Sequence, residues 1–152
     1  MKTISLAFLA APMVLATVLA AQTAAPPPAA ASDQKEIPQW RGQYGGYPEF
    51  ATRVLRGNEA WAGFWKQVNR DMPRQLDPAA EMAVAVFVGE RRTGGYVVQV
   101  LSAGVEKDDF IVVYEERAPG PDQFVTQALT TPWVVAVVPL SDRPVVFKPK
   151  AK

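Results

Sequence analysis

The residues of this chain that could do chemistry are acids, serines and lysines, because cysteine and histidine are both absent. Without these two residue types, thiolate nucleophiles, Cys/His zinc sites and His-based triads are excluded. Ser102 and Ser141 therefore have no histidine to activate them, and nothing in the spacing of Lys107 favours a Ser-Lys pair. The remaining catalytic option is a pair of carboxylates.

Two acidic pairs occur, Glu115-Glu116 and Asp108-Asp109. Adjacent residues of a strand point to opposite faces, so Glu115 and Glu116 cannot face one substrate together. The run Lys107-Asp108-Asp109 is typical of a tight turn in solvent. Glycoside hydrolysis needs two carboxylates across a cleft, and a domain this small offers little cleft. The sequence therefore predicts no catalytic residue, no metal site and no cofactor, and we expect a protein that is not an enzyme.

The most distinctive polar segment is Gly89–Tyr96, which separates two apolar runs and carries two arginines and a Gly-Gly pair. Glycine permits positive φ angles and a close backbone approach. One interpretation is a hairpin connection with a polar tip, and the other is a loop that presents its backbone and arginines to a partner. Together with the segment Thr130–Trp133, it gives the candidate partner-binding residues Arg91, Arg92, Thr93, Gly94, Gly95, Tyr96, Thr130, Pro132 and Trp133.

Aromatic residues offer an alternative function. Trp40, Tyr44 and Tyr47 lie close together in the sequence and would suit a small-molecule or glycan-binding protein of the cell envelope if they were exposed. Trp61 and Trp65 belong to a different pattern, because they fall on one predicted helical face and are expected in the core.

One amphipathic helix is predicted over Glu59–Asn69. Its apolar residues Trp61, Phe64, Trp65 and Val68 follow the i, i+3, i+4, i+7 spacing. Asn58 is the expected N-cap, following a short strand over 51–56. The segment before that strand, 37–50, is expected to be extended or looped.

Strands are predicted for the second half of the chain. Met82–Val88 is continuously apolar and should be buried on both faces. The further predicted strands are Gly95–Leu101, Phe110–Glu116, Thr131 or Trp133 to Val138, and an edge strand Pro144–Phe147. The predicted fold class is α+β: an antiparallel sheet of about five strands, as a meander or small open barrel, with one N-terminal amphipathic helix.

The N-terminus predicts export. Residues 1–21 have one lysine, an apolar stretch and small residues at its end, as in a signal peptide, and an uncleaved anchor is the alternative. Residues 22–36 predict a disordered Ala/Pro-rich linker, and residues 37–150 a single domain. Removing residues 1–21 leaves 15 basic and 15 acidic residues. We therefore expect a periplasmic or secreted protein with no nucleic-acid partner and no stable membrane insertion after cleavage.

From Met82 onward the chain resembles the C-terminal domain of the PrcB family. The resemblance rests on Gly89, Thr93-Gly94-Gly95-Tyr96 opening a strand, Phe110–Glu115, Pro119-Gly120, Gln127-Ala128-Leu129-Thr130, and Pro132-Trp133 leading into Val134–Pro139. Two features depart from the family pattern. Arg91-Arg92 stand where lysine-proline-type residues are expected, and Trp133 stands where another aromatic is usual.

The resemblance implies an exported, non-catalytic domain that binds a protein. The founding member of the family is associated with binding and stabilising a surface protease complex. The expected partner is thus a protein, with a protease as the specific case, and stabilisation and inhibition both stay open. Some members are lipoproteins, but this chain has no cysteine that could be lipidated.

Overall fold

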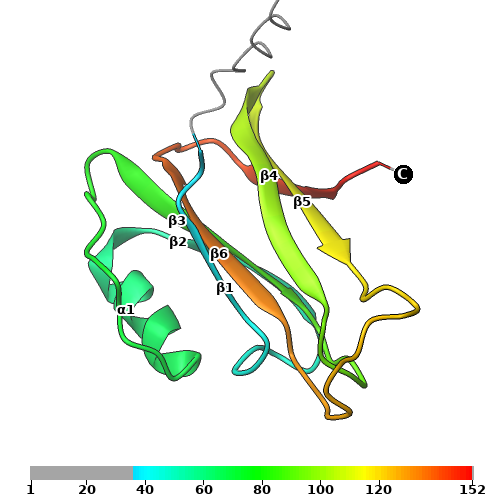
Figure 1. The fold of residues 1–152 in the computed structure, drawn as a ribbon. Coiled ribbons are helices and arrows are strands. Elements are labelled where there is room, and N and C mark those ends of the chain that lie inside the picture. The colour runs from blue at the N-terminus through cyan, green and yellow to red at the C-terminus, as the bar shows by residue number, and fades with distance from the viewer. Residues whose placement is uncertain (1–35, 152) are drawn as a thin grey trace, which may run out of the picture. The chain divides into compact units, whose positions relative to one another are not determined.

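The computed structural model describes residues 36–151. The predicted signal peptide and all but the last residue of the predicted linker lie outside the described residues. The described part contains seven strands and one helix (Figure 1). In chain order these are β1 Gln39–Gly42, β2 Phe50–Leu55, α1 Gly57–Gln67, β3 Glu81–Val88, β4 Val97–Glu106, β5 Asp109–Arg117, β6 Trp133–Pro139 and β7 Val145–Pro149.

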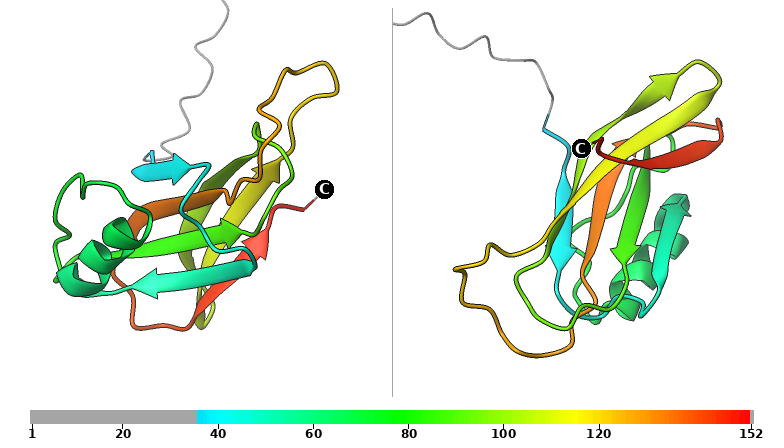
Figure 2. Two further views of the ribbon diagram at one scale, coloured as in Figure 1. Left: turned by 90° about the horizontal axis from the view of Figure 1, so that it is seen from below. Right: turned by 90° about the vertical axis from the view of Figure 1, so that its right-hand side faces the viewer.

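The strands form two sheets with the helix on the outer face of one of them (Figures 1 and 2). The first sheet is antiparallel throughout and has the order β1-β6-β3-β2. The second has the order β4-β5-β7, with β4 antiparallel and β7 parallel to β5. The layers are therefore helix, four-stranded sheet and three-stranded sheet.

The mostly β fold with one helix is confirmed, but the strands are arranged differently from a single sheet. The consecutive strands β3 and β4 lie in different sheets, which excludes a meander. The last strand pairs in parallel with β5, although only antiparallel pairing was expected. The segment 37–50 also supplies β1 and the first residue of β2, which raises the number of strands above five. The tight turn at Lys107 is confirmed, with φ 54° at that residue.

The central strands β3 and β6 are buried on both faces, as predicted for β3. Side chains alternate across a strand, so each strand contributes to two cores. Val84 and Val86 of β3 pack in the cluster shared with the three-stranded sheet, while Ala85 and Phe87 pack in the cluster beneath the helix. Apolar burial stabilises by about 25 cal/mol per Å². Because the chain has no cysteine, these two cores stabilise the fold without any disulfide.

Helix α1 begins at Gly57, two residues before the predicted start, and ends at Gln67. Its buried face is Trp61, Phe64 and Trp65, as the spacing predicts. The N-cap prediction is wrong: the cap position is Arg56, and it makes no side-chain cap hydrogen bond. Asn58 falls inside the helix, because Gly57 takes a φ of 78° that turns the chain directly into it.

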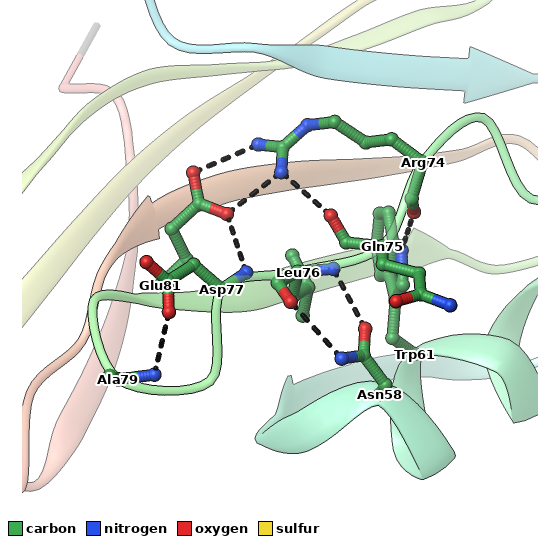
Figure 3. A network of polar contacts seen from close by, with 8 residues as sticks. All are labelled: Asn58, Trp61, Arg74, Gln75, Leu76, Asp77, Ala79 and Glu81. Carbon is green, nitrogen blue, oxygen red and sulfur yellow. Dashed lines mark hydrogen bonds and ion pairs between the residues drawn. The ribbon is translucent and has the colours of Figure 1, made fainter.

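Asn58 instead ties the helix to the connection that follows it (Figure 3). Its Nδ2 donates to Leu76 O over 3.0 Å, and Leu76 N–H donates to its Oδ1 over 2.7 Å. Trp61 Nε1 donates to Arg74 O over 2.7 Å. Arg74 forms two hydrogen bonds with the Glu81 carboxylate at the start of β3. The connection between α1 and β3 is therefore held at Arg74 and Leu76 although it has no regular structure.

Candidate functional site

Two loops lie side by side at one end of the sheets (Figures 1 and 2). They are the β3–β4 loop, residues 89–96, and the β5–β6 loop, residues 118–132, and we call them the paired loops. Arg91 and Thr130 exchange two backbone hydrogen bonds of 2.8 Å, and Gly94 N–H donates to Thr126 O over 2.9 Å. Thr130 Oγ1 donates to Thr93 O over 2.8 Å. The structure thus brings together the two segments that the sequence singled out.

The second glycine of the Gly-Gly pair, Gly95, stands where the backbone requires a residue without a side chain. Its φ is 85°, a conformation that side chains disfavour. A Cβ atom at this position would lie 2.5 Å from Val125 Cγ1 and 2.9 Å from Pro119 Cβ. The close approach of the paired loops therefore depends on a residue without a side chain.

Arg91 holds the paired loops to strand β5. Its Nε and Nη2 donate to the two carboxylate oxygens of Glu116 over 2.7 and 2.9 Å. Its guanidinium also lies 5.5 Å from the centre of the Tyr96 ring. The hydrogen bonds that Arg91 donates to Glu116 raise the pKa of Arg91 above its ordinary value. Both charges of this pair are satisfied within the domain, so Arg91 is a positioning residue.

Arg92 differs from its neighbour because it is exposed, with no hydrogen-bond or ion-pair partner for its side chain among residues 36–151. Arg91 and Thr130 form an antiparallel bridge, and Arg92 and Leu129 are the residues next to it in the two loops. Leu129 is 61% exposed, and Phe124 on the same loop is fully exposed. The exposed side chains of the paired loops thus include one cation and two large apolar groups, beside acidic and polar residues such as Glu90 and Asp122.

The predicted site residues of the second segment lie inside the domain. Thr130, Pro132 and Trp133 are all buried. Trp133 Nε1 donates to Tyr44 O over 2.7 Å, and a Cβ on Gly42 would lie 2.7 Å from the Trp133 ring. These three side chains offer no surface to a partner and serve to seat the β5–β6 loop. Among the residues of the first loop, Thr93 and Tyr96 are half-buried and Gly94 is buried.

Sequence reasoning missed Phe124 and stressed Leu129 only as part of a motif. Phe124 is the one aromatic residue in the polar stretch 118–131. A large apolar residue that belongs to neither a strand nor a helical face has no expected place in a core. That mismatch is the signal that could have identified it.

The aromatic residues proposed for ligand binding do not form a joint platform. They line three separate clefts, with Trp40 in one, Tyr44 in a second and Tyr47 in a third. The Trp40 ring centre lies 5.8 Å from both Trp61 and Trp65. Tyr47 donates its hydroxyl hydrogen to Gln67 Oε1 over 2.9 Å. Tyr44 alone of the three is largely exposed.

The two adjacent acids of β5 take different partners. Glu116 binds Arg91, whereas Glu115 accepts hydrogen bonds from Lys150 Nζ at 2.9 Å and from Gln99 Nε2 at 3.0 Å. The hydrogen bonds from Lys150 and then Gln99 lower the pKa of Glu115 from 4.5. Both carboxylates are thus engaged in ion pairs, as expected of side chains on opposite faces of a strand.

Residues 36–151 contain no cluster of three or more potential metal ligands. Within the same range, no helix has the length and apolar character needed to cross a membrane.

Comparison with known proteins finds a family match that covers strands β3 to β6 and the paired loops. Residues 82–139 match the family model described as PrcB C-terminal. The match runs from the start of β3 to the end of β6 and includes both loops. No curated protein and no solved structure matches the chain. No catalytic family is evident from the match. Residues 82–139 of this chain are therefore similar to the PrcB C-terminal domain.

Proposed function

We propose that this protein is an exported, non-catalytic protein-binding module that docks onto an envelope protease through its paired loops. The proposal rests mainly on the exposed apolar side chains of the β5–β6 loop. The β5–β6 loop is fixed to its neighbour by four hydrogen bonds, and yet it holds the fully exposed Phe124 and the exposed Leu129 in water. Burying one such side chain in a partner stabilises by roughly 1.5–3 kcal/mol.

Order in the loops makes this exposure useful for binding. A loop that is already fixed loses little conformational entropy when a partner binds. Aromatic anchors and arginines are also the side chains that dominate binding energy at protein interfaces. Phe124 and Leu129 would enter an apolar depression on the partner, and Arg92 would meet an acidic group beside it.

The proposed protease partner and the proposed envelope location rest on the sequence. The resemblance to the PrcB family implies a protease partner, because its founding member is associated with stabilising a surface protease complex. Residues 1–21 have the pattern of an export signal. A chain without cysteine or histidine also lacks the thiolate nucleophile and the commonest general base of catalytic sites. A binding role therefore fits the residues better than a catalytic one.

Affinity capture from solubilised cell envelope tests the proposal. Phe124→Ser is compared with Val105→Ser, because Val105 is also an exposed apolar side chain (57%) but lies near the β4–β5 turn. We expect the wild type and Val105→Ser to enrich the same protease or protease-complex subunit, and Phe124→Ser to lose it. Equal enrichment by both variants would remove the paired loops from the proposal.

A further inference from the structure

The four-stranded sheet ends at β2, and no other strand of residues 36–151 pairs with the outer edge of β2 (Figure 2). The direction of its backbone groups follows from the neighbouring strand β3. Val88 N–H donates to Pro132 O over 3.2 Å, so the backbone groups of Val88 point toward β6. These groups alternate in direction along a strand, so those of Phe87 point toward β2 and its partner Ala51. Ala51 and every second residue after it are therefore the residues that bond β3.

The other residues of β2 have backbone groups that point away from the sheet. They are Phe50, Thr52 and Val54. No loop or side chain among residues 36–151 hydrogen-bonds the N–H or C=O of these three. The strand is also accessible, because Phe50 is 57% exposed and Thr52 and Val54 are only half-buried. A row of free donors and acceptors at an open edge is a template for a further strand.

The other sheet edges are protected in ways that β2 is not. At the β1 and β4 edges, the Gln39 amide bonds both the N–H and the C=O of Val100, over 2.9 and 3.2 Å. Strand β7 ends in Pro149, which has no N–H to offer. Strand β2 contains no proline, and its register with β3 runs without a bulge. Its one charged side chain, Arg53, packs over the Tyr47 ring at 5.0 Å.

The sequence of β2 is complementary to itself. An antiparallel pair of β2 strands with a twofold axis through Thr52 sets Phe50 of one copy opposite Val54 of the other, and cross-strand pairs of this kind are stabilising. Ala51 then lies opposite Arg53. A register centred on Arg53 would set two arginines opposite each other, which is unfavourable. The 15 basic and 15 acidic residues after residue 21 balance, so two copies do not repel each other as whole molecules.

We propose that β2 pairs with β2 of a second copy, in the register centred on Thr52. The pairing joins two four-stranded sheets into one antiparallel sheet. Strand β2 begins opposite the end of β3, where the paired loops start. Because the two β2 strands run in opposite directions, the paired loops of the two copies lie at opposite ends of the joined sheet. The dimer thus carries two docking surfaces, which goes beyond the proposed function and does not depend on it.

Sedimentation equilibrium of the chain, purified in the form that the cell produces, tests the dimer. Thr52→Pro removes an N–H that β3 does not use, and Phe50→Ser removes the exposed ring. We expect each to raise the dimer Kd about tenfold. Val105→Ser, at an equally exposed apolar position (57%), should dimerise as the wild type does. A wild type that stays monomeric at millimolar concentration would overturn the proposal and leave the edge to a strand of a different protein. Unchanged dimerisation of Phe50→Ser and Thr52→Pro would overturn it too.

Disulfide trapping tests the register, because the natural chain has no cysteine. The single variants Ala51→Cys and Arg53→Cys are mixed in equal amounts and oxidised mildly. In the proposed register these two positions form a non-hydrogen-bonded pair with Cα atoms about 4.5 Å apart, within the range that a disulfide spans. We expect the mixed disulfide to exceed both homodisulfides, which mass spectrometry distinguishes. A predominant homodisulfide of Arg53→Cys, or no disulfide at all, would contradict the proposed pairing.

Discussion

Arg91 and Arg92 are adjacent and chemically identical, but their surroundings give them opposite roles. The guanidinium of Arg91 is engaged by both oxygens of Glu116, whereas that of Arg92 is free among residues 36–151. We expect Arg91→Ala to lower the free energy of unfolding, because the ion pair with Glu116 is lost. The loss should be only about 1 kcal/mol, because this pair is partly exposed.

Arg92→Ala should leave the free energy of unfolding unchanged and reduce capture of the partner. Denaturant unfolding and affinity capture of the two single variants measure these effects separately. A loss of stability in Arg92→Ala, with Arg91→Ala as stable as the wild type, would reverse the assignment. Testing the two arginines only as a double variant would mix loop stability with partner contact.

Glycine at position 95 is needed for the pairing of the loops. In Gly95→Ala, the added methyl group would meet Val125 and Pro119 at a φ of 85°. We expect a loss of about 1–3 kcal/mol in unfolding free energy and faster hydrogen exchange at the Gly94 amide. Gly120→Ala is the matched control in the β5–β6 loop, because a Cβ there meets nothing within 4 Å. Normal Gly94 protection in Gly95→Ala would show that the loops pair without this glycine.

Glu115 makes part of the stability depend on pH. The hydrogen bonds from Lys150 and Gln99 lower the pKa of Glu115 in the folded protein below 4.5. A carboxyl group with a lowered folded pKa stabilises the protein above its unfolded pKa, and this contribution is lost as the pH falls through the folded value. We expect the wild type to lose stability below about pH 4.5 more steeply than Glu115→Gln. Parallel unfolding curves for the two proteins from pH 6 to pH 3 would contradict this.

At the scale of elements, helix α1 depends on the connection that follows it. Asn58 makes two hydrogen bonds to the backbone of Leu76 from inside the helix. We expect Asn58→Ala to lower the unfolding free energy by about 1–3 kcal/mol, because the enclosed Leu76 groups lose their partner.

Gly63→Ala tests the same helix in the opposite direction. A Cβ at Gly63 meets nothing within 4 Å, so the substitution should raise the unfolding free energy by roughly 0.5–1 kcal/mol. Thermal unfolding of both variants gives the comparison. A neutral Asn58→Ala would mean that solvent replaces the amide at Leu76.

Elements with a strong periodic or continuous apolar pattern were predictable from the sequence. Helix α1 follows from the spacing of Trp61, Phe64 and Trp65, and β3 follows from its unbroken apolar run. The short strand β1 was not predictable from the sequence. Its four residues form a strand only by pairing with β6, more than 90 positions later. The parallel pairing of β7 with β5 also depends on long-range contacts that no local pattern encodes.

The candidate site was predictable only in part, because local patterns mark its segments but long-range contacts arrange them. Composition marked the loop from Arg91 to Tyr96, and the structure pairs it with the segment ending at Trp133. Which side chains are exposed depends on how the two loops pack, so the burial of Trp133 and the exposure of Phe124 needed the structure. Sequence could name the segments, but the contacts decide which residues a partner can touch.

At the scale of the whole domain, the paired loops connect the two sheets. Arg91 follows β3 of the four-stranded sheet, and Glu116 belongs to β5 of the three-stranded sheet. The surface that carries Phe124 is therefore braced from both layers of the β core. Such bracing suits a docking surface, because the supporting sheets are more rigid than the loops themselves.

Photo-crosslinking in intact cells tests whether the paired loops contact a protease. A benzophenone amino acid replaces Phe124 in one strain and Val105 in another, and the covalent adducts are identified by mass spectrometry. We expect one dominant adduct from position 124, with a protease or a subunit of its complex, and none of it from position 105. The same adduct from both positions, or no protease-complex protein at position 124, would contradict it.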